Sequence, residues 1–259
     1  MKKKYIFFDI DGTLTDKRTG KIVDSAKEAI RRLQDAGHFV AIATGRANYK
    51  SLGVALELGI HHIVSNGGGT IMVNDEIIYN EPLDYEKCLF TIKQAEELGY
   101  GVLVSEKNNI EVFMNNERFI QQMGYRKEPT RYIYDKERPY SDIKEFLKIY
   151  ISIPKSEEHQ LTYLNDLGHI RFLGDYLYIQ HDKKDEGIYK MLELINGNRE
   201  DVVVFGDDDN DLIMFKDEWL KVAMGNACDN LKKKADYIAR DNIDDGILHA
   251  CYDLQLIKE

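Results

Sequence analysis

Continuous apolar runs alternate with helical patterns over the first third of the chain. Runs such as Tyr5–Phe8 and Phe39–Ala43 are typical of strands that are buried on both faces of a sheet. Between these two runs, apolar residues recur at helical spacing, and Ser25 and Glu28 have the spacing of a capping box. We therefore expect a capped helix that follows Ser25 and ends at Gly37.

The same alternation continues toward residue 80 and returns in the last third of the chain. We expect a helix that ends near Gly59, a strand at 63–64 and a hairpin with its turn at 74–75. A helix over 188–195 and a buried strand at 202–205 follow much later. Strand–helix alternation of this kind predicts an α/β fold: a doubly wound, Rossmann-like parallel sheet that is covered on both faces.

The segment between these two parts has a different composition, with more Tyr, Lys and Glu and with alternating strands. We expect a mostly antiparallel sheet there, with helices over one face. An insertion of about 100 residues has the size of a typical domain. The sequence thus predicts a catalytic core of residues 1–82 and 182–259 and an inserted α+β cap domain at 83–181. The expected strands lie at 102–104, 110–113, 150–153, 170–172 and 176–179, and the expected helices near 84–98, 116–123 and 159–164.

Composition narrows the class of protein. Hydrophobic residues make up 43% and charged residues 31% of the chain, as is ordinary for a globular protein. The sequence contains no run of about 18 apolar residues, the length that a membrane-spanning helix needs. The apolar stretch behind the basic start, Tyr5–Phe8, is shorter than a secretory signal requires. Cys88, Cys228 and Cys251 have no CxxC spacing and fit reduced thiols. We therefore expect a cytoplasmic protein without a membrane partner.

The net charge of −10 argues against a nucleic-acid partner, because proteins that bind the phosphate backbone usually carry the opposite charge. An anionic small molecule would meet the same repulsion at this protein. A site for such a ligand must therefore supply local positive charge, from a metal ion or from basic side chains placed nearby.

A pair of carboxylates follows the first predicted strand, in the string Asp9-Ile10-Asp11-Gly12-Thr13. Residues at i and i+2 of an extended chain point the same way, so Asp9 and Asp11 face one centre. Two adjacent carboxylates repel each other unless a cation or a proton lies between them. Mg²⁺ prefers carboxylate oxygens, so the string predicts a magnesium site.

A second acidic cluster follows the strand at 202–205, where residues 206–211 read GDDDND. A helix start would favour one or two acidic residues, but it does not explain four carboxylates in five positions. In open α/β sheets, ligands bind at the carboxyl ends of the strands. Asp9, Thr44 and Asp207 all follow predicted strands, and we therefore expect them at the same edge of the sheet.

These motifs resemble those of the haloacid dehalogenase superfamily. The four that match are DIDGT at 9–13, TGR at 44–46, a lysine that opens a late helix, and GDDDND. More narrowly, the chain resembles the Cof-type phosphatases with a type IIB cap, which share elements like SNGG at 65–68, KDEGI at 184–188, AMGNA at 223–227, ADY at 235–237 and DG at 245–246. The chain departs from the family where Asp208 and Asp185 replace common glycines and Ala239 replaces a common threonine.

The resemblance implies a magnesium-dependent phosphatase that hydrolyses small phosphorylated metabolites, such as sugar phosphates and nucleotide or cofactor monophosphates. Asp9 would be the nucleophile that forms an aspartyl-phosphate, and Asp11 the general acid and base. The metal ligands implied are Asp9, Asp11, Asp207 and Asp211, where Asp211 binds the metal directly or acts through another ligand. The residues implied to bind the phosphoryl group are Thr44, Gly45, Lys184 and Asn210, with Arg46 and Asn66 as further candidates.

Several alternatives remain open from the sequence. Lys183 competes with Lys184 for the role of the phosphoryl-binding lysine. Arg46 either orients the substrate or forms a salt bridge to the cap, and Asn66 either contacts the substrate or shapes a turn. A phosphomutase on the same fold and a non-catalytic, phosphate-binding regulatory protein are the alternative functions. Neither the physiological substrate nor the oligomeric state is indicated.

Overall fold

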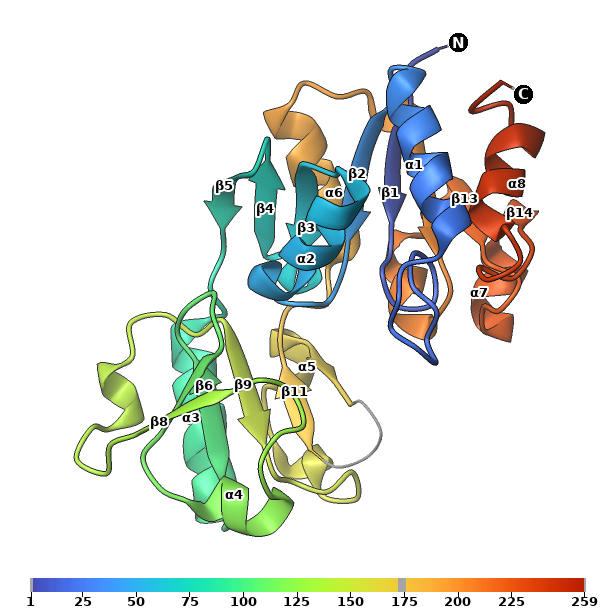
Figure 1. Ribbon diagram of the computed structural model, residues 1–259. Helices are drawn as coiled ribbons and strands as arrows, with labels where there is room; N and C mark the ends of the chain where they lie inside the picture. The colour runs from blue at the N-terminus through green and yellow to red at the C-terminus, as the bar shows by residue number, and fades with distance from the viewer. Residues whose placement is uncertain (1, 172–175, 259) are drawn as a thin grey trace. The chain divides into compact units, whose positions relative to one another are not determined.

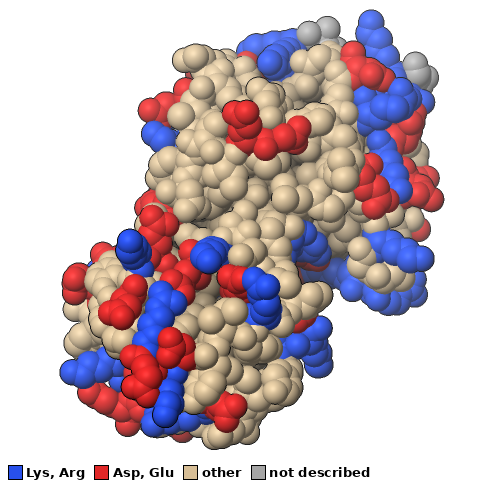
Figure 2. Space-filling model, turned by 60° about the vertical axis from the view of Figure 1, so that its left-hand side comes forward, with Lys and Arg blue, Asp and Glu red and all other residues tan. Residues whose placement is uncertain are grey.

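The computed structural model describes residues 2–171 and 176–258, which fall into two compact units (Figure 1). The larger unit is discontinuous in sequence and comprises Met1–Asn80 and Lys183–Glu259; the smaller comprises Glu81–Asp182. Among the described residues, no helix is long and apolar enough to cross a membrane. Basic and acidic side chains are interspersed on the face drawn in Figure 2, so on this face the net negative charge is not gathered into one patch.

The larger unit is built on an eight-stranded sheet in the order β14-β13-β12-β1-β2-β3-β4-β5. The neighbouring strands from β14 to β3 run parallel, and the hairpin β4–β5 adds antiparallel pairing at one edge. The strands are β1 (Tyr5–Phe8), β2 (Phe39–Ala43), β3 (His62–Ser65), β4 (Thr70–Val73), β5 (Glu76–Asn80), β12 (Val202–Gly206), β13 (Leu220–Ala223) and β14 (Tyr237–Ile238).

Side chains of β1 alternate between the two faces of this sheet. Ile6 and Phe8 pack in one buried cluster with α1, α2 and α8, whereas Phe7 packs in another with α6 and α7. Helices α1 and α8 lie side by side on their face of the sheet (Figure 1). Both faces are covered, and the predicted doubly wound, Rossmann-like α/β core is confirmed. The helices are α1 (Asp24–Asp35), α2 (Asn48–Leu58), α6 (Lys184–Leu194), α7 (Asp229–Lys234) and α8 (Gly246–Asp253).

Turn residues place the helix and hairpin ends where the sequence predicts them. Gly59 ends α2 in the left-handed conformation, with φ of 63°. Asn74 and Asp75 connect β4 to β5, and their φ angles of 52° and 65° are those that a tight hairpin turn requires. Short polar side chains tolerate this conformation better than most residues, which is why the turn could be read from the sequence.

The predicted capping box of α1 is wrong. The helix begins at Asp24, after Val23, and no side chain caps its first turn. Glu28 instead accepts hydrogen bonds from Arg31 and Arg32 on the next turn of the same helix. The Glu28 carboxylate could either cap the start of the helix or pair with an arginine at i+3 or i+4. In this structure it forms the ion pairs.

The smaller unit contains a second, six-stranded sheet in the order β10-β11-β9-β6-β7-β8. The pairs are antiparallel except that β7 and β8 are parallel. Strand β8 was not predicted, because three of its four residues are exposed and it shows no apolar alternation. The predicted strand at 170–172 reaches Phe172, which lies outside the described residues. The strands are β6 (Val102–Ser105), β7 (Glu111–Met114), β8 (Arg131–Tyr134), β9 (Lys148–Ile151), β10 (His169–Ile170) and β11 (Leu177–Ile179).

Helices lie on both faces of this smaller sheet, which corrects the prediction that they cover one face. Val102 and Val104 of β6 pack with α3 and α5, whereas Leu103 packs with Phe119 of α4. Helical spacing in the sequence shows that a helix has an apolar face, but it does not show which of the two faces of the sheet that helix covers. The elements are α3 (Tyr85–Glu97), α4 (Arg118–Met123) and α5 (Leu164–Leu167), with short 3₁₀ turns η2 (Tyr140–Asp142) and η3 (Glu158–Gln160).

Candidate active site

Two carboxylates meet where the neighbouring strands β1 and β12 end. The strands are parallel, with Phe8 opposite Phe205, so Asp9 and Asp207 leave the sheet at the same edge. The Asp9 amide still donates to the Phe205 carbonyl at 3.0 Å, which fixes where its side chain starts. Gly12 then turns the chain with φ of 93°, and a Cβ at this residue would lie only 2.3 Å from Asp207 Oδ2. The close approach of these two loops therefore requires glycine.

Asp9, Asp207 and Asp211 form a buried acidic cluster, in which one carboxylate oxygen of each residue lies within 4.8 Å of the other two. Lys184 enters this cluster from the first turn of α6. Its ammonium group lies 2.8 Å from Asp9 Oδ1 and 2.6 Å from Asp211 Oδ1, and its side chain is 2% exposed. Two of the three buried carboxylates, Asp9 and Asp211, thus share one fully buried lysine.

Asp211 lies in the 3₁₀ segment η5 (Asp209–Met214), and both of its oxygens have partners in the protein. Oδ1 accepts from Lys184, and Oδ2 accepts from the amides of Asp207 and Asp208 at 2.9 and 3.2 Å. Asp211 therefore holds the loop that follows β12 and orients Lys184 at the same time.

Lys17 supplies a second positive charge to the cluster. Its Nζ lies 2.7 Å from Asp207 Oδ2 and 2.8 Å from Asp208 Oδ2. The other oxygen of Asp207 accepts a hydrogen bond from the Thr13 hydroxyl at 3.1 Å. Lys17 was not predicted from the sequence, because it belongs to none of the motifs and lies in an irregular turn whose path shows no periodicity.

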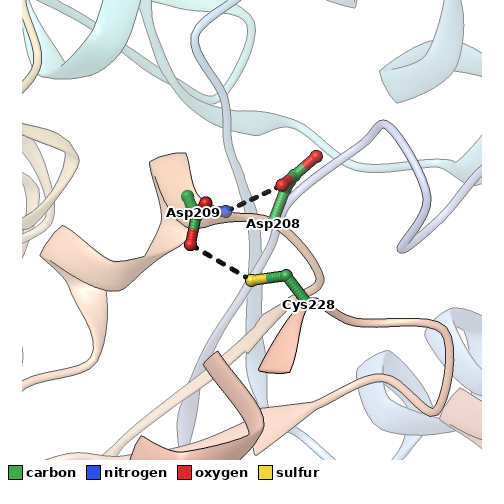
Figure 3. Close-up of side chains that lie close together, drawn as sticks. All are labelled: Asp208, Asp209 and Cys228. Atoms are coloured by element: carbon green, nitrogen blue, oxygen red, sulfur yellow. Dashed lines mark hydrogen bonds between the residues drawn. The ribbon is translucent and has the colours of Figure 1, made fainter. Parts of the chain in front are cut away.

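Asp208, which stands where the resembled family commonly has glycine, follows Asp207 in the chain, and Figure 3 shows it beside Asp209 and Cys228. Its carboxylate accepts from the amide of Asp209, whose own side chain accepts from Cys228. Asp208 and Asp209 are both exposed, in contrast to the buried Asp207 beside them. The amide contact and the capping bonds to Asp211 show that the loop accommodates an aspartate here.

Burial dominates the electrostatics of the cluster. It raises the pKa of Asp207 to about 6, although Lys17 pulls that pKa downward. Burial and repulsion from Asp211 likewise raise the pKa of Asp9 well above its ordinary value, despite the contact with Lys184. Taken without a further cation, the cluster therefore has more negative charge than its two lysines balance.

The raised pKa of Asp207 predicts how stability changes with pH in the absence of metal. The folded protein binds this proton more tightly than the unfolded chain, so the free energy of unfolding falls as pH rises from about 4 to about 6. A shift of this size corresponds to about 2–3 kcal/mol. The measurement is urea unfolding in EDTA at a series of pH values. Between about pH 4 and about pH 6, the free energy of unfolding of wild type should fall by this amount relative to that of Asp207→Asn.

The comparison with Asp207→Asn is needed because His62 acts in the opposite direction. Burial lowers the pKa of His62 to about 4, so its contribution grows as pH rises through the same range. Asp207→Asn retains His62 and removes only the titrating carboxyl. Equal pH profiles for wild type and Asp207→Asn would show that Asp207 has an ordinary pKa in the folded protein.

Arg46 and Asp11 form an ion pair at the mouth of the cluster. The guanidinium Nε donates to Asp11 Oδ2 at 2.8 Å, and the Asp11 side chain is 55% exposed. The carboxylate of Asp11 thus faces Arg46 and lies outside the group formed by Asp9, Asp207 and Asp211. The sequence left open a salt bridge from Arg46 to the cap; the ion pair described here is a different one, to Asp11 within the larger unit.

The remaining predicted residues lie on the loops that follow β2 and β3, and on η5. Thr44 is buried, and its hydroxyl accepts from the amide of Arg46 at 3.1 Å. Asn66 opens the turn η1 (Asn66–Gly68) with φ of 52°, and its amide group donates to Thr70 at 2.9 Å. These contacts give Asn66 a turn role. Asn210 is half-buried within η5, and Gly45 lies between Thr44 and Arg46.

Lys183 lies immediately before α6, and Lys184 is the first residue of the helix. The Lys183 amide donates to the Gly67 carbonyl at 2.8 Å, and its ammonium group lies 3.8 Å from Glu186. Of these two lysines, Lys184 is the one whose ammonium group contacts Asp9 and Asp211 of the buried acidic cluster. Gly68 packs against the Lys183 backbone so tightly that an added Cβ would lie 2.1 Å from its carbonyl oxygen, and this contact fixes the start of the helix.

The sequence profile of the haloacid dehalogenase-like hydrolases matches residues 6–251. The chain belongs to this family. Its resemblance to the Cof-type phosphatases with a type IIB cap is supported by similarity to the solved structure of the HAD subclass IIB sugar phosphatase BT4131. That structure has a TM-score of 0.77 and 27% identity, over 98% of this chain and all of the other.

Related proteins of known sequence extend this similarity over the whole chain. YkrA of Bacillus subtilis (strain 168), which is named as a candidate phosphatase, is 31% identical over 261 residues, with both chains covered completely. The 5-amino-6-(5-phospho-D-ribitylamino)uracil phosphatase YcsE of the same organism is 28% identical over 252 residues, covering 95% of this chain and 94% of its own. This member of the haloacid dehalogenase-like hydrolases is therefore a phosphatase, a phosphoric monoester hydrolase.

Proposed function

We propose that this phosphatase hydrolyses small phosphorylated metabolites in a magnesium-dependent reaction that passes through an aspartyl-phosphate on Asp9. The observation that supports this most directly is the position of Asp9. Its carboxylate lies at the end of β1, buried beside the ammonium group of Lys184 and within 4.8 Å of the carboxylates of Asp207 and Asp211. This position supports the proposal, because the proposed nucleophile lies beside groups that would stabilise charge.

The residues of the cluster fit a divalent metal ion. Hard carboxylate oxygens are the ligands that Mg²⁺ prefers. The three buried carboxylates and Asp208 together carry −4, and Lys184 and Lys17 carry +2, so a divalent ion brings the group to neutrality. Asp9 and Asp207 would hold the ion, with the Asp11 region beside them. Asp211 would act indirectly, because both of its oxygens are engaged by Lys184 and by backbone amides.

When bound, the metal ion would neutralise charge on the phosphoryl oxygens and on Asp9. In the first step, an Asp9 oxygen attacks phosphorus, the bond to the ester oxygen breaks, and Asp11 gives its proton to the leaving alkoxide. In the second step, Asp11 takes a proton from water, the water oxygen attacks phosphorus, and the Asp9–phosphorus bond breaks. Arg46 pairs with both oxygens of Asp11 in this structure, so this ion pair would open for either proton transfer.

The phosphoryl oxygens would be bound by groups on the loop after β2, on η5 and at the start of α6. Lys184 supplies a charge-assisted hydrogen bond from inside the cluster. The Thr44 hydroxyl, the Gly45 amide and the Asn210 side chain supply neutral donors. Phosphoryl transfer depends mostly on positioning and charge stabilisation, so these groups together with the metal would provide most of the rate enhancement.

The substrate class proposed is sugar phosphates and nucleotide or cofactor monophosphates. BT4131 is named as a sugar phosphatase and YcsE as a 5-amino-6-(5-phospho-D-ribitylamino)uracil phosphatase. We propose that the smaller unit, Glu81–Asp182, is the cap that selects among these substrates, because the larger unit holds every residue that would contact the phosphoryl group. Binding energy from the rest of the substrate would come from the cap.

A phosphate-release screen tests this function. We expect the purified protein to release phosphate from a subset of phosphorylated sugars, nucleotides and cofactor precursors in Mg²⁺, and to be silent in EDTA. Calcium should support little turnover, because its larger and looser coordination shell misplaces the nucleophile. Activity that persists in EDTA, or that needs zinc and ignores magnesium, would contradict the metal site. Transfer of the phosphoryl group within a sugar, without release, would indicate a phosphomutase.

A further inference from the structure

Lys17 makes contacts that the proposed reaction does not use. Its ammonium group lies between Asp207 Oδ2, at 2.7 Å, and Asp208 Oδ2, at 2.8 Å. The Asp207 side chain is completely buried, whereas the Asp208 side chain is 53% exposed. One cation therefore bridges an interior carboxylate of the proposed metal site and a surface carboxylate at its rim.

The contact with Asp207 involves the oxygen that a metal ion would need. Thr13 already donates to Oδ1 of Asp207, so Oδ2 is the oxygen left for a cation, and Lys17 lies on it. An ammonium group and a divalent ion cannot bind the same oxygen at hydrogen-bond or coordination distance without repelling each other. Lys17 must leave Asp207 before a metal can use that oxygen.

The turn that carries Lys17 allows such a movement of the side chain. Its backbone is held on both sides, because the Asp16 amide donates to the Lys21 carbonyl at 3.0 Å and the Gly20 amide donates to the Asp16 carbonyl at 2.8 Å. The Lys17 side chain itself is 48% exposed. The ammonium group can therefore rotate outward on its flexible stem while the turn stays in place.

We propose that Lys17 is a tethered cation that competes with the divalent metal for Asp207, and that Asp208 retains Lys17 when the metal binds. The inference rests on the proposed function, because it concerns the same metal site. In the metal-free protein, Lys17 stabilises the buried Asp207. With metal bound, the pair of Lys17 and Asp208 remains at the rim, where an aspartate replaces the family's common glycine.

Magnesium binding to the full-length protein, measured by calorimetry, tests the competition. Lys17→Met should bind Mg²⁺ roughly three- to tenfold more tightly than wild type, the range expected when one close charge contact is removed. Lys21→Met is the matched control, since it removes the same charge from the same turn, and should change the affinity by less than about twofold. Thermal unfolding in EDTA should show that Lys17→Met is the less stable of the two variants.

Asp208→Asn tests the second half of the inference. Removing the partner that retains Lys17 should weaken Mg²⁺ binding in wild type, and the loss should shrink when Lys17 is already Met. A double-mutant cycle separates this coupling from the plain loss of a negative charge near the metal, which would be equal in both backgrounds. Equal losses would overturn the role of Asp208.

The outcomes separate this inference from the proposed function. If wild type binds Mg²⁺ and releases phosphate but Lys17→Met binds Mg²⁺ no more tightly than Lys21→Met does, the competition is refuted and the phosphatase mechanism stands. If wild type binds no Mg²⁺ at all, both are overturned. The competition would also be refuted if Lys17→Met had the circular dichroism of wild type but bound Mg²⁺ more weakly. That result would mean that Lys17 favours metal binding.

Discussion

Asp9→Asn should reduce phosphate release by at least about 10⁴-fold, the scale seen when a covalent nucleophile is removed from an enzyme. The amide has the shape of the carboxylate, but it cannot attack phosphorus. Lys184 keeps its contact with Asp211 in this variant, so the buried lysine retains a partner and the fold should persist. The measurement is steady-state phosphate release in Mg²⁺ with the best substrate of the screen.

Asp24→Asn is the matched control for this substitution. It makes the same chemical change on the same unit, but at a fully exposed side chain in the first turn of α1. Its rate should stay within about twofold of wild type, since surface substitutions away from special features have small effects. Mass spectrometry of acid-quenched wild type should show an added phosphoryl group that Asp9→Asn lacks. Wild-type turnover by Asp9→Asn would refute the covalent mechanism.

The sheet could be predicted from the sequence because its strands are buried on both faces. Continuous apolar runs such as Val202–Gly206 are typical of strands in a parallel sheet that is buried on both faces. The polar residue that follows each run marks the carboxyl end of its strand. The proximity of Asp9 and Asp207 follows from that edge alone, although they are far apart in the chain. The doubly wound core and the meeting of these two carboxylates are therefore consequences of strand pattern.

Contacts made by loop side chains could not be predicted in the same way. Lys17 and Arg46 both reach carboxylates across turns whose backbone path depends on glycines and local hydrogen bonds. A long side chain in such a turn can reach several acidic groups, and only coordinates select among them. The same limit applies to the helices of the smaller unit. Phe119 packs with Leu103 on one face of the sheet, and the sequence does not show which of the two faces a helix will cover.

Lys184→Met should lower the rate by about 10²–10³-fold, the cost of removing one preorganised donor from a transition state. Methionine keeps the length and the apolar stem of lysine, but it supplies no charge to the phosphoryl oxygens. The change also leaves Asp9 and Asp211 without their shared cation in a buried site. The variant should therefore be less stable than wild type in EDTA at neutral pH, and Mg²⁺ should restore much of that stability.

Lys183→Met is the matched control for this variant, because it removes the same charge from the adjacent residue. Lys183 is anchored by its backbone to Gly67, and its ammonium group points to Glu186, so the substitution leaves the cluster intact. Its rate should fall by no more than a few-fold. The effect of Lys184→Met should appear in kcat as well as kcat/KM, because charge on the phosphoryl oxygens shifts in the transition state. A larger loss for Lys183→Met would show that the neighbouring lysine binds the phosphoryl group.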